Sequence, residues 1–171
     1  MEEQWWPPSN RPVEWLEEGQ VQYVSEPIPP EERDDSAPPL LLDAPLTFDG
    51  APVVHAFPTE QKVLAAVPFY FALPNVTYIR GATLYYKPFG AKKFARAAMS
   101  RLEKGFAEVV PCESIRVTGN LEYFIRLYDD GGELQDSLGT RAAPLVVAIR
   151  TELQGGTPAL PGKIPERCRV R

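Results

Sequence analysis

Hydrophobic and polar residues alternate most regularly in the segment 119–135. On one face of an extended chain, the pattern places four apolar residues, namely Leu121, Tyr123, Ile125 and Leu127. The sequence Asp-Asp-Gly-Gly follows at 129–132. It is typical of a tight turn; its carboxylates could also bind calcium, although EF-hand spacing is missing. The segment therefore predicts a β-strand that runs into a hairpin, within a small antiparallel β domain.

Further short apolar segments, separated by turn residues, continue to residue 150. They are predicted as strands at 53–57, 62–73, 77–87, 93–101, 106–110 and 145–150. For 93–101 a helical turn is the alternative, since three of its residues are alanine. Pro68 lacks a backbone donor, so its segment requires an edge position, a bulge or a break. About seven strands at this spacing predict an all-β fold, an antiparallel β-sandwich of immunoglobulin or fibronectin III type. A small barrel is the alternative.

Composition divides the chain into three parts: an extended, proline-rich, acidic arm (1–52), the β-sandwich domain (53–150) and a C-terminal strap (151–171). Residues 1–60 hold 11 of the 19 prolines and carry 13 acidic but only two basic residues. Residues 61–171 carry 16 basic and 10 acidic residues. This asymmetry predicts different roles for the parts. The strap is rich in proline and glycine, and we expect it to run irregularly over the surface.

The arm has two interpretations. Its Pro-Pro pairs favour extended geometry, as in a solvated linker. Linkers are poor in aromatic residues, however, whereas this arm holds all three tryptophans. If the arm instead docks on a partner or on the chain's own basic domain, its anchors are expected to be Trp5, Trp6, Trp15, Tyr23, Leu40, Leu41 and Leu42.

A second candidate surface is a group of basic residues around one predicted hairpin: Lys87, Lys92, Lys93, Arg96, Arg101 and Lys104. It could bind an anionic polymer or an acidic protein, receive the acidic arm, or be a solvated hairpin whose lysines discourage edge pairing. Tyr85, Phe124 and Tyr128 are predicted to point outward. We expect the arm to cover them, because they would otherwise form an exposed apolar patch.

Cys112 and Cys168 are the only cysteines, and His55 is the only histidine. A zinc site needs about four ligands, and no family signature surrounds a nucleophile pair of Cys112 and His55. A disulfide is the simpler interpretation, with two free thiols as the alternative. A disulfide would indicate an oxidising compartment.

Several segments, taken in order, resemble the immunoglobulin-like domain of secreted or envelope-associated proteins from myxobacteria and related bacteria. They are GATLYYKPFGAKKFARAAM, GFAEVVPCESI, GNLEYFIRLYDDGGE, APLVVAI and LPGKIPERC, within residues 61–168. In that family a Leu-Tyr-Tyr-Lys-like strand precedes a Pro-Gly turn, and the chain ends in a Leu-Pro-Gly…Pro…Cys strap. The resemblance implies an architectural module with no common enzymatic activity.

These observations favour an interaction protein over an enzyme. The sequence shows no catalytic carboxylate pair, phosphate-binding glycine loop or serine nucleophile motif, and we expect no cofactor and no metal. The net charge of −5 argues against nucleic acid as the partner. We expect a structural subunit of a bacterial cell-envelope or surface assembly that docks on other protein subunits. The alternative is a carbohydrate-binding module or accessory domain that recognises an envelope polysaccharide through outward aromatic residues.

The expected location is periplasmic or extracellular. No apolar run approaches the roughly 20 residues of a transmembrane helix. The first ten residues lack the basic and apolar regions of a signal peptide, so this location implies a mature chain. A cytoplasmic location is the alternative.

Overall fold

The computed structural model describes residues 22–170 of the 171-residue chain. Within this range the fold is all-β, as predicted, with two short 3-10 helices, η3 (Pro30–Glu32) and η4 (Cys112–Ser114), and no α-helix. Residues 22–170 form fourteen strands, several of only two or three residues, so the predicted number of about seven is not confirmed. In the described range, no helix is long and apolar enough to cross a membrane.

The larger of two main sheets has six strands and is built around the strand predicted at 119–129. Its order is β5-β13-β11-β7-β8. β13 pairs with the first half of β11, and β12 pairs with the second half. All neighbours are antiparallel except β13 and β5, which are parallel. The strands are β5 (Glu60–Lys62), β7 (Ile79–Lys87), β8 (Ala95–Ala98), β11 (Gly119–Asp129), β12 (Leu134–Leu138) and β13 (Leu145–Arg150).

The second sheet has four antiparallel strands in the order β4-β6-β10-β9. They are β4 (Val54–His55), β6 (Val67–Ala72), β9 (Ser100–Leu102) and β10 (Gly105–Val110). Pro68 pairs only with β10, because β4 reaches no further than Phe71 and Ala72. This free side of β6 is the edge position predicted for a proline, whose missing N–H leaves no donor unpaired there.

The segment predicted as one strand at 93–101 is divided between the two sheets. β8 pairs with β7 in the larger sheet, whereas β9 pairs with β10 in the smaller one. Between them lies Met99, which is buried and donates its backbone N–H to Ala82 O at 2.9 Å. The chain thus crosses from one layer to the other at a single core residue.

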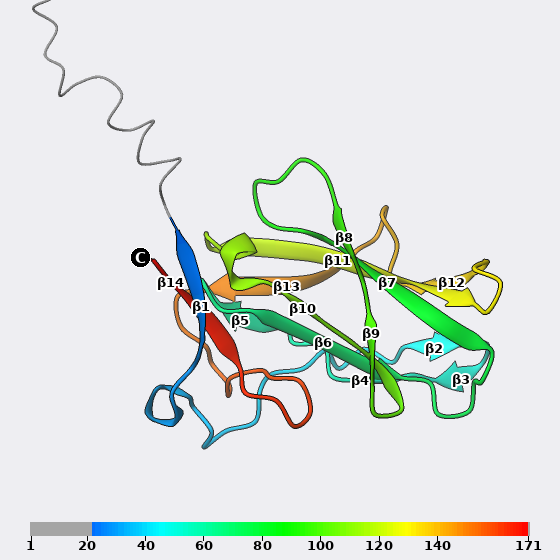
Figure 1. The fold of residues 1–171 in the computed structure, drawn as a ribbon, viewed down its shortest axis with the longest axis horizontal. Helices are drawn as coiled ribbons and strands as arrows, with labels where there is room; N and C mark the ends of the chain where they lie inside the picture. Colours follow the sequence, from blue (N-terminus) through cyan, green and yellow to red (C-terminus); the bar gives the residue numbers. More distant parts are fainter. Residues whose placement is uncertain (1–21, 171) are drawn as a thin grey trace, which may run out of the picture.

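The two sheets pack against each other as layers, and the main core lies between them (Figure 1). Leu121, Tyr123, Ile125 and Leu127 are all at most 1% exposed, which confirms the predicted inner face of β11. The ring of Tyr123 lies 4.4 Å from that of Phe69 on β6 and 5.8 Å from that of Phe57, centroid to centroid. Such aromatic pairs join the layers both by area and by ring geometry.

The predicted division into arm, domain and strap does not correspond to separate structural units within residues 22–170. β1 (Tyr23–Pro27), from the arm, pairs antiparallel with β14 (Glu166–Val170), from the strap, as Figure 1 shows at its left side. The end of the strap is therefore a strand and not irregular. β2 (Thr47–Phe48) and β3 (Ala51–Pro52) form a small hairpin whose Phe48 is buried in the main core.

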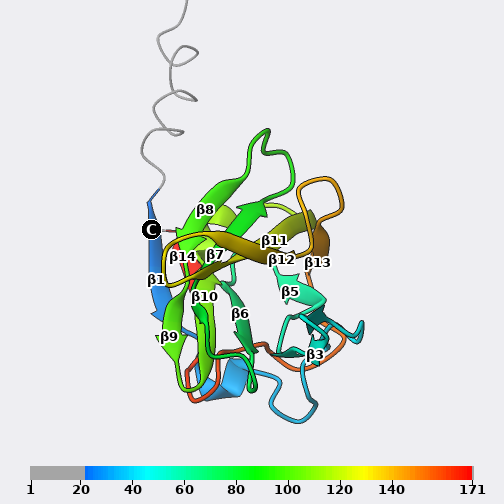
Figure 2. The same cartoon turned by 90° about the vertical axis from the view of Figure 1, so that its right-hand side faces the viewer.

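The arm and the strap also contact each other away from their strands. Gly156 N donates to Pro38 O at 2.9 Å. A Cβ atom added at Gly156 would lie 2.0 Å from Ala37 O, so this close approach of two backbones requires glycine. Ile28 N likewise donates to Pro165 O at 2.9 Å. Figure 2 shows the fold from a second side, with β5 at the edge of the larger sheet beside β13 and β3 at the lower right.

One buried carboxylate holds the strap in place. Glu60 is 2% exposed, and its Oε2 accepts hydrogen bonds from the backbone N–H groups of Gln154 (2.7 Å) and Gly155 (2.9 Å). Its Oε1 lies 3.5 Å from Nε of Arg150. A charged acceptor strengthens such bonds, so Glu60 fastens the start of the strap to the edge of the larger sheet.

Replacing Glu60 with alanine is expected to destabilise the fold by about 2–4 kcal/mol, because two backbone donors lose their acceptor and each costs about 1–3 kcal/mol when buried unpaired. Urea denaturation would measure this loss. Glu152→Ala, at an exposed carboxylate in the same part of the strap, is the control and should change stability little. Equal midpoints for the two variants would contradict this role of Glu60.

Candidate functional site

The most distinctive surface of the molecule is the outer face of the larger sheet. The register places Arg96 of β8 beside Tyr85 of β7, and Tyr85 beside Phe124 of β11. Paired residues in an antiparallel sheet project to the same side, so these three side chains form a row. The rings of Tyr85 and Phe124 are parallel within 1°, with centroids 4.8 Å apart.

Positively charged side chains cover this aromatic row. The guanidinium of Arg126 lies 5.0 Å from the ring centroid of Tyr85, and that of Arg141 lies 5.2 Å from the ring of Phe94. Lys87 Nζ lies 5.3 Å from the centroid of the same Phe94 ring. These distances are typical of cation–π interactions. We call the cationic face the set Lys87, Lys92, Lys93, Arg96, Arg126 and Arg141.

Phe124 is buried, at 1% exposure, although it points away from the main core. Its cover comes from Phe94, whose ring packs edge-on at 5.1 Å, and from Arg126 and Arg141, at 5.6 and 5.7 Å. The expectation that the arm covers the outward aromatic residues is not met by residues 22–52, which pack against the strap and the main core instead. Hairpin and loop residues of the domain itself supply the cover.

Carboxylates are scarce around the cationic face. Lys87 Nζ lies 3.2 Å from Glu122 Oε2. Among residues 22–170, no other carboxylate lies within 4.0 Å of any of its six cations. Lys92, Lys93, Arg96 and Arg141 are exposed. The face therefore presents several positive charges whose counter-charge does not come from the described part of the chain.

Tyr85 and Tyr128, beside this face, hydrogen-bond to each other, and their pKa values are shifted in opposite directions. Burial raises the pKa of Tyr85, but the hydrogen bond with Tyr128 and the charge of Arg126 outweigh burial and leave this pKa lowered. Burial, together with the same hydrogen bond, raises the pKa of Tyr128. Arg126 favours the ionised form of both phenols, but for Tyr128 burial and the hydrogen bond with Tyr85 outweigh this effect on the pKa.

The predicted basic group is only partly one surface. Lys87, Lys92, Lys93 and Arg96 lie together on the β7–β8 hairpin, but Arg101 and Lys104 lie on the β9–β10 hairpin of the other sheet. There, Arg101 covers the ring of Phe106 at 4.4 Å. Arg126 and Arg141 were not among the predicted basic residues. The alternation along 119–129 already put Arg126 on the outer side, whereas Arg141 comes from a loop with no pattern.

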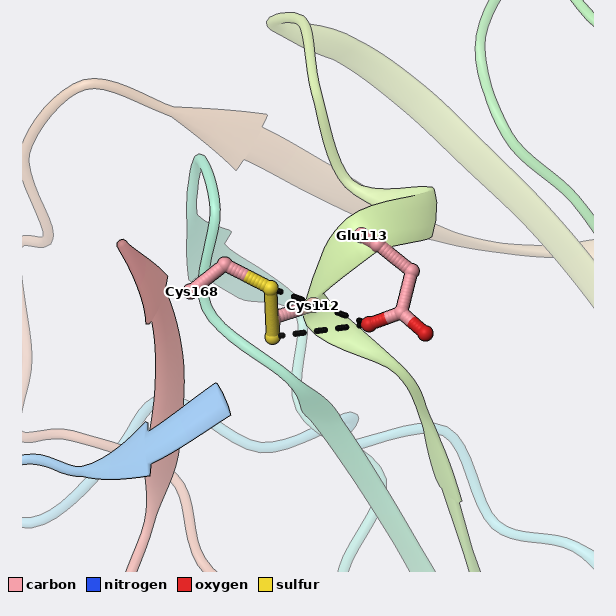
Figure 3. A group of neighbouring side chains, drawn as sticks. All are labelled: Cys112, Glu113 and Cys168. Carbon is pink, nitrogen blue, oxygen red and sulfur yellow. Dashed lines mark hydrogen bonds between the residues drawn. A yellow bond between two sulfur atoms is a disulfide. The ribbon is translucent and has the colours of Figure 1, made fainter. Parts of the chain in front are cut away.

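Cys112 and Cys168 form a disulfide, with an S–S distance of 2.04 Å and 5.4 Å between their Cα atoms. Figure 3 shows the bond beside Glu113, whose Oε2 lies 3.8 and 3.7 Å from the two sulfurs. These three residues are the one group in the described range that could hold a metal ion, but bridged sulfurs are not thiolate ligands. The bridge also removes Cys112 as a nucleophile. His55 instead stacks on Phe57, with centroids 4.9 Å apart.

The disulfide joins η4 to β14 within a second, smaller core. Tyr23 of β1, Leu64 and Val109 pack against the buried pair and Ala66. β14 also pairs on its other side, since Cys168 N donates to Leu64 O at 2.7 Å and Ala66 N to Glu166 O at 2.9 Å. β14 is therefore held by β1, by the segment 64–66 and by a covalent bond.

The described part of the acidic arm finds its counter-charges on β14. Glu26 Oε1 lies 3.3 Å from Arg167 and 2.9 Å from Arg169, and Glu32 binds Arg167 as well. The Arg167 hydrogen bond lowers the pKa of Glu32, against a smaller effect of desolvation. This part of the arm therefore folds on the strap's arginines and not on the cationic face.

The predicted arm anchors have different environments. Tyr23 packs against the disulfide, and Leu42 packs against the main core. Leu40 and Leu41 are about 41% and 42% exposed. Trp5, Trp6 and Trp15 lie outside the described residues. Tyr23 and Leu42 thus already contact this chain, and Leu40 and Leu41 are accessible to a partner.

The Asp-Asp-Gly-Gly segment makes a turn, as expected. Asp129 Oδ1 accepts hydrogen bonds from the backbone N–H groups of Gly131 and Glu133, both at 2.9 Å. Its Oδ2 accepts one from Gln135 Nε2 at 2.8 Å. Both carboxylate oxygens therefore serve the hairpin.

A groove of about 490 Å³ lies between the strap and the free side of β6. Its walls are mostly apolar and come from β1, the start of β6, β10 and the strap, including Pro27, Ala66, Pro68, Val109, Leu160 and Ile164. It is the second candidate surface, and unlike the cationic face it offers chiefly apolar contact.

No protein family model matches this chain, and no curated protein matches it.

Removing the disulfide is expected to lower the free energy of unfolding by about 4 kcal/mol, from the chain entropy of a loop of 56 residues. Thermal unfolding of Cys112→Ser/Cys168→Ser, compared with the wild-type chain, would measure the loss. Reduction of the wild-type protein should reproduce it. A reductant-insensitive melting temperature would contradict the prediction.

Acid is expected to loosen β1 and β14 before the main core. The pKa of Glu32 is lowered from its ordinary value of 4.5 in the folded chain, so its ion pair stabilises the fold above that value. This contribution is lost as the pH falls through the lower, folded pKa. Amide NMR signals of Tyr23–Pro27 should therefore shift as the pH falls below 4.5, while those of β11 stay in place. In Glu32→Gln the early shift should be smaller, and an unchanged acid response would be evidence against the ion pair.

Proposed function

We propose that this chain is a non-enzymatic structural subunit of a bacterial cell-envelope or surface assembly, and that it binds an acidic partner protein through the cationic face. The observation that carries the proposal is the arrangement of Arg126 and Arg141 over the partly buried rings of Tyr85 and Phe94, with a single carboxylate of residues 22–170 within 4.0 Å of the six cations. We also propose that the strands have an immunoglobulin-like topology, because residues 61–168 resemble an immunoglobulin-like domain.

The chemistry of stacked guanidinium groups supports a carboxylate-bearing partner. A guanidinium that lies over a ring loses some rotational freedom but keeps its N–H groups along the edge of its plane. A carboxylate can bind two of these groups at once, in the plane of the guanidinium. The rings beneath Arg126 and Arg141 therefore hold the donors in place before a partner arrives, which lowers the entropy cost of binding.

A rigid scaffold suits such a docking surface. β11 contributes Arg126 to the cationic face, Phe124 to the aromatic row beside it and Tyr123 to the core, so the face is fixed to an inner strand of the larger sheet. The bridge between Cys112 and Cys168 supports an oxidising location such as the periplasm or the cell exterior, where disulfides persist.

Carbohydrate recognition is the weaker candidate. It would need exposed flat rings for stacking on sugars. Phe124 is covered by Phe94 and Arg141, and the Tyr85 ring is occupied by Phe124 on one side and Arg126 nearby. The faces of these rings are thus already covered by side chains of the same chain and are not free to stack on a sugar.

Binding of poly-L-glutamate, followed by calorimetry at low salt, tests the proposal. Affinity should fall in Arg126→Gln/Arg141→Gln and remain in Lys163→Gln, which removes an exposed cation of the strap. Salt should weaken binding, because the Debye length shortens from about 30 Å at 0.01 M to about 3 Å at 1 M. Binding to neutral or anionic polysaccharide or to DNA, with none to poly-L-glutamate, would overturn the proposed partner class.

A further inference from the structure

We infer that residues 1–21 of the chain bind its own cationic face, so that an acidic partner must compete with them. The inference deepens the proposed function, since it concerns the same face. The segment carries five glutamates and one arginine, and it holds all three tryptophans of the chain. Its composition is thus the complement of a surface made of arginines and aromatic rings.

Charge balance within the molecule points to this segment. The described acidic arm residues Glu26 and Glu32 are already paired with Arg167 and Arg169. The cationic face has only Glu122 beside it among residues 22–170. No other described carboxylate of the arm lies within 4.0 Å of a cation of this face. The acidic residues of the arm outside the described part lie in residues 1–21, in which Glu14, Glu17 and Glu18 flank Trp15 and Leu16.

The side chains of residues 1–21 match the cationic face both in their charge and in the contacts that they can make with arginine. Tryptophan is the best aromatic partner for a guanidinium, and glutamate offers the two oxygens that a guanidinium edge binds. Arg96 and Arg141 are exposed and can meet both. A segment with carboxylates alone would gain only screened charge attraction, which is weak at a protein surface.

The length of the segment permits docking within one molecule. An extended chain of 21 residues spans up to about 70 Å, whereas a domain of about 150 residues has a radius of gyration of roughly 15 Å. A tethered ligand acts at an effective concentration in the millimolar range, which favours the face of the same molecule over that of another. We therefore assign the docking to a single molecule.

Tryptophan fluorescence of the full chain tests the inference directly, because every tryptophan lies in residues 1–21. At low salt the emission should be shifted to shorter wavelength and protected from acrylamide. High salt should abolish both effects. Arg126→Gln/Arg141→Gln should abolish them too, whereas Lys163→Gln should not. Equal acrylamide quenching in the wild-type chain, the double variant and high salt would overturn the inference.

A second variant avoids any change in the folded domain. Glu14→Gln/Glu17→Gln/Glu18→Gln should bind poly-L-glutamate more tightly than the wild-type chain, by about tenfold if the segment covers the face nine-tenths of the time. Equal affinity for the two chains would contradict self-docking. If neither chain binds poly-L-glutamate but the tryptophans are protected, self-docking holds and the proposed partner class fails.

The molecularity of docking is tested by dilution. Protection that is independent of protein concentration, with a monomer by light scattering, supports docking within one molecule. Protection that disappears on dilution, together with dimers or larger species, would overturn that assignment and show exchange of the segment between copies.

Discussion

The structure depends on the alternation of side chains along β11. Every second residue enters the main core, where Tyr123 joins the two sheets through its contacts with Phe57 and Phe69. The residues between them must then face outward, and in an ordinary sandwich they would be polar. Here one of them is Phe124, a large apolar side chain on the solvent side. Its presence requires a cover, and that requirement accounts for the folded-back Phe94 and for the arginines above the rings. The cationic face is thus a consequence of how the central strand is built.

The sequence pattern correctly predicted those features of the fold that neighbouring residues determine. The inner face of β11, the Asp129 turn and the edge position of Pro68 follow from side-chain period, turn chemistry and a missing donor. The disulfide was the simplest of several interpretations for two cysteines. Features set by distant contacts were missed: the crossing between sheets at Met99, the pairing of β1 with β14, and Arg141 over Phe94. None of these leaves a period in the sequence, because each contact joins residues from separate parts of the chain.

The charge asymmetry of the sequence did not indicate which basic residues the acidic arm contacts. It predicted different roles for the parts, and docking of the acidic arm on basic groups of the chain was one of the interpretations left open. The arm does meet basic groups, through Glu26 and Glu32. The basic groups are those of β14, which the sequence pattern had placed in an irregular strap. Lysines and arginines of the β7–β8 hairpin were more numerous and more conspicuous. Proximity to a strand pairing, and not the density of charge, determined which cations the described part of the arm uses.

The pairing of β1 with β14 also has a mechanical consequence. Tyr23 lies opposite Val170, so the two strands begin and end at the same place. Tension applied between these residues would separate the backbone pairs one after another, which needs little force compared with shearing a whole strand. Separation would proceed to Ser25, opposite Cys168, where the bond to Cys112 transfers the load into the sandwich. The long stretch between the two cysteines would carry none of it, so β1 can peel away under load while the two main sheets stay packed.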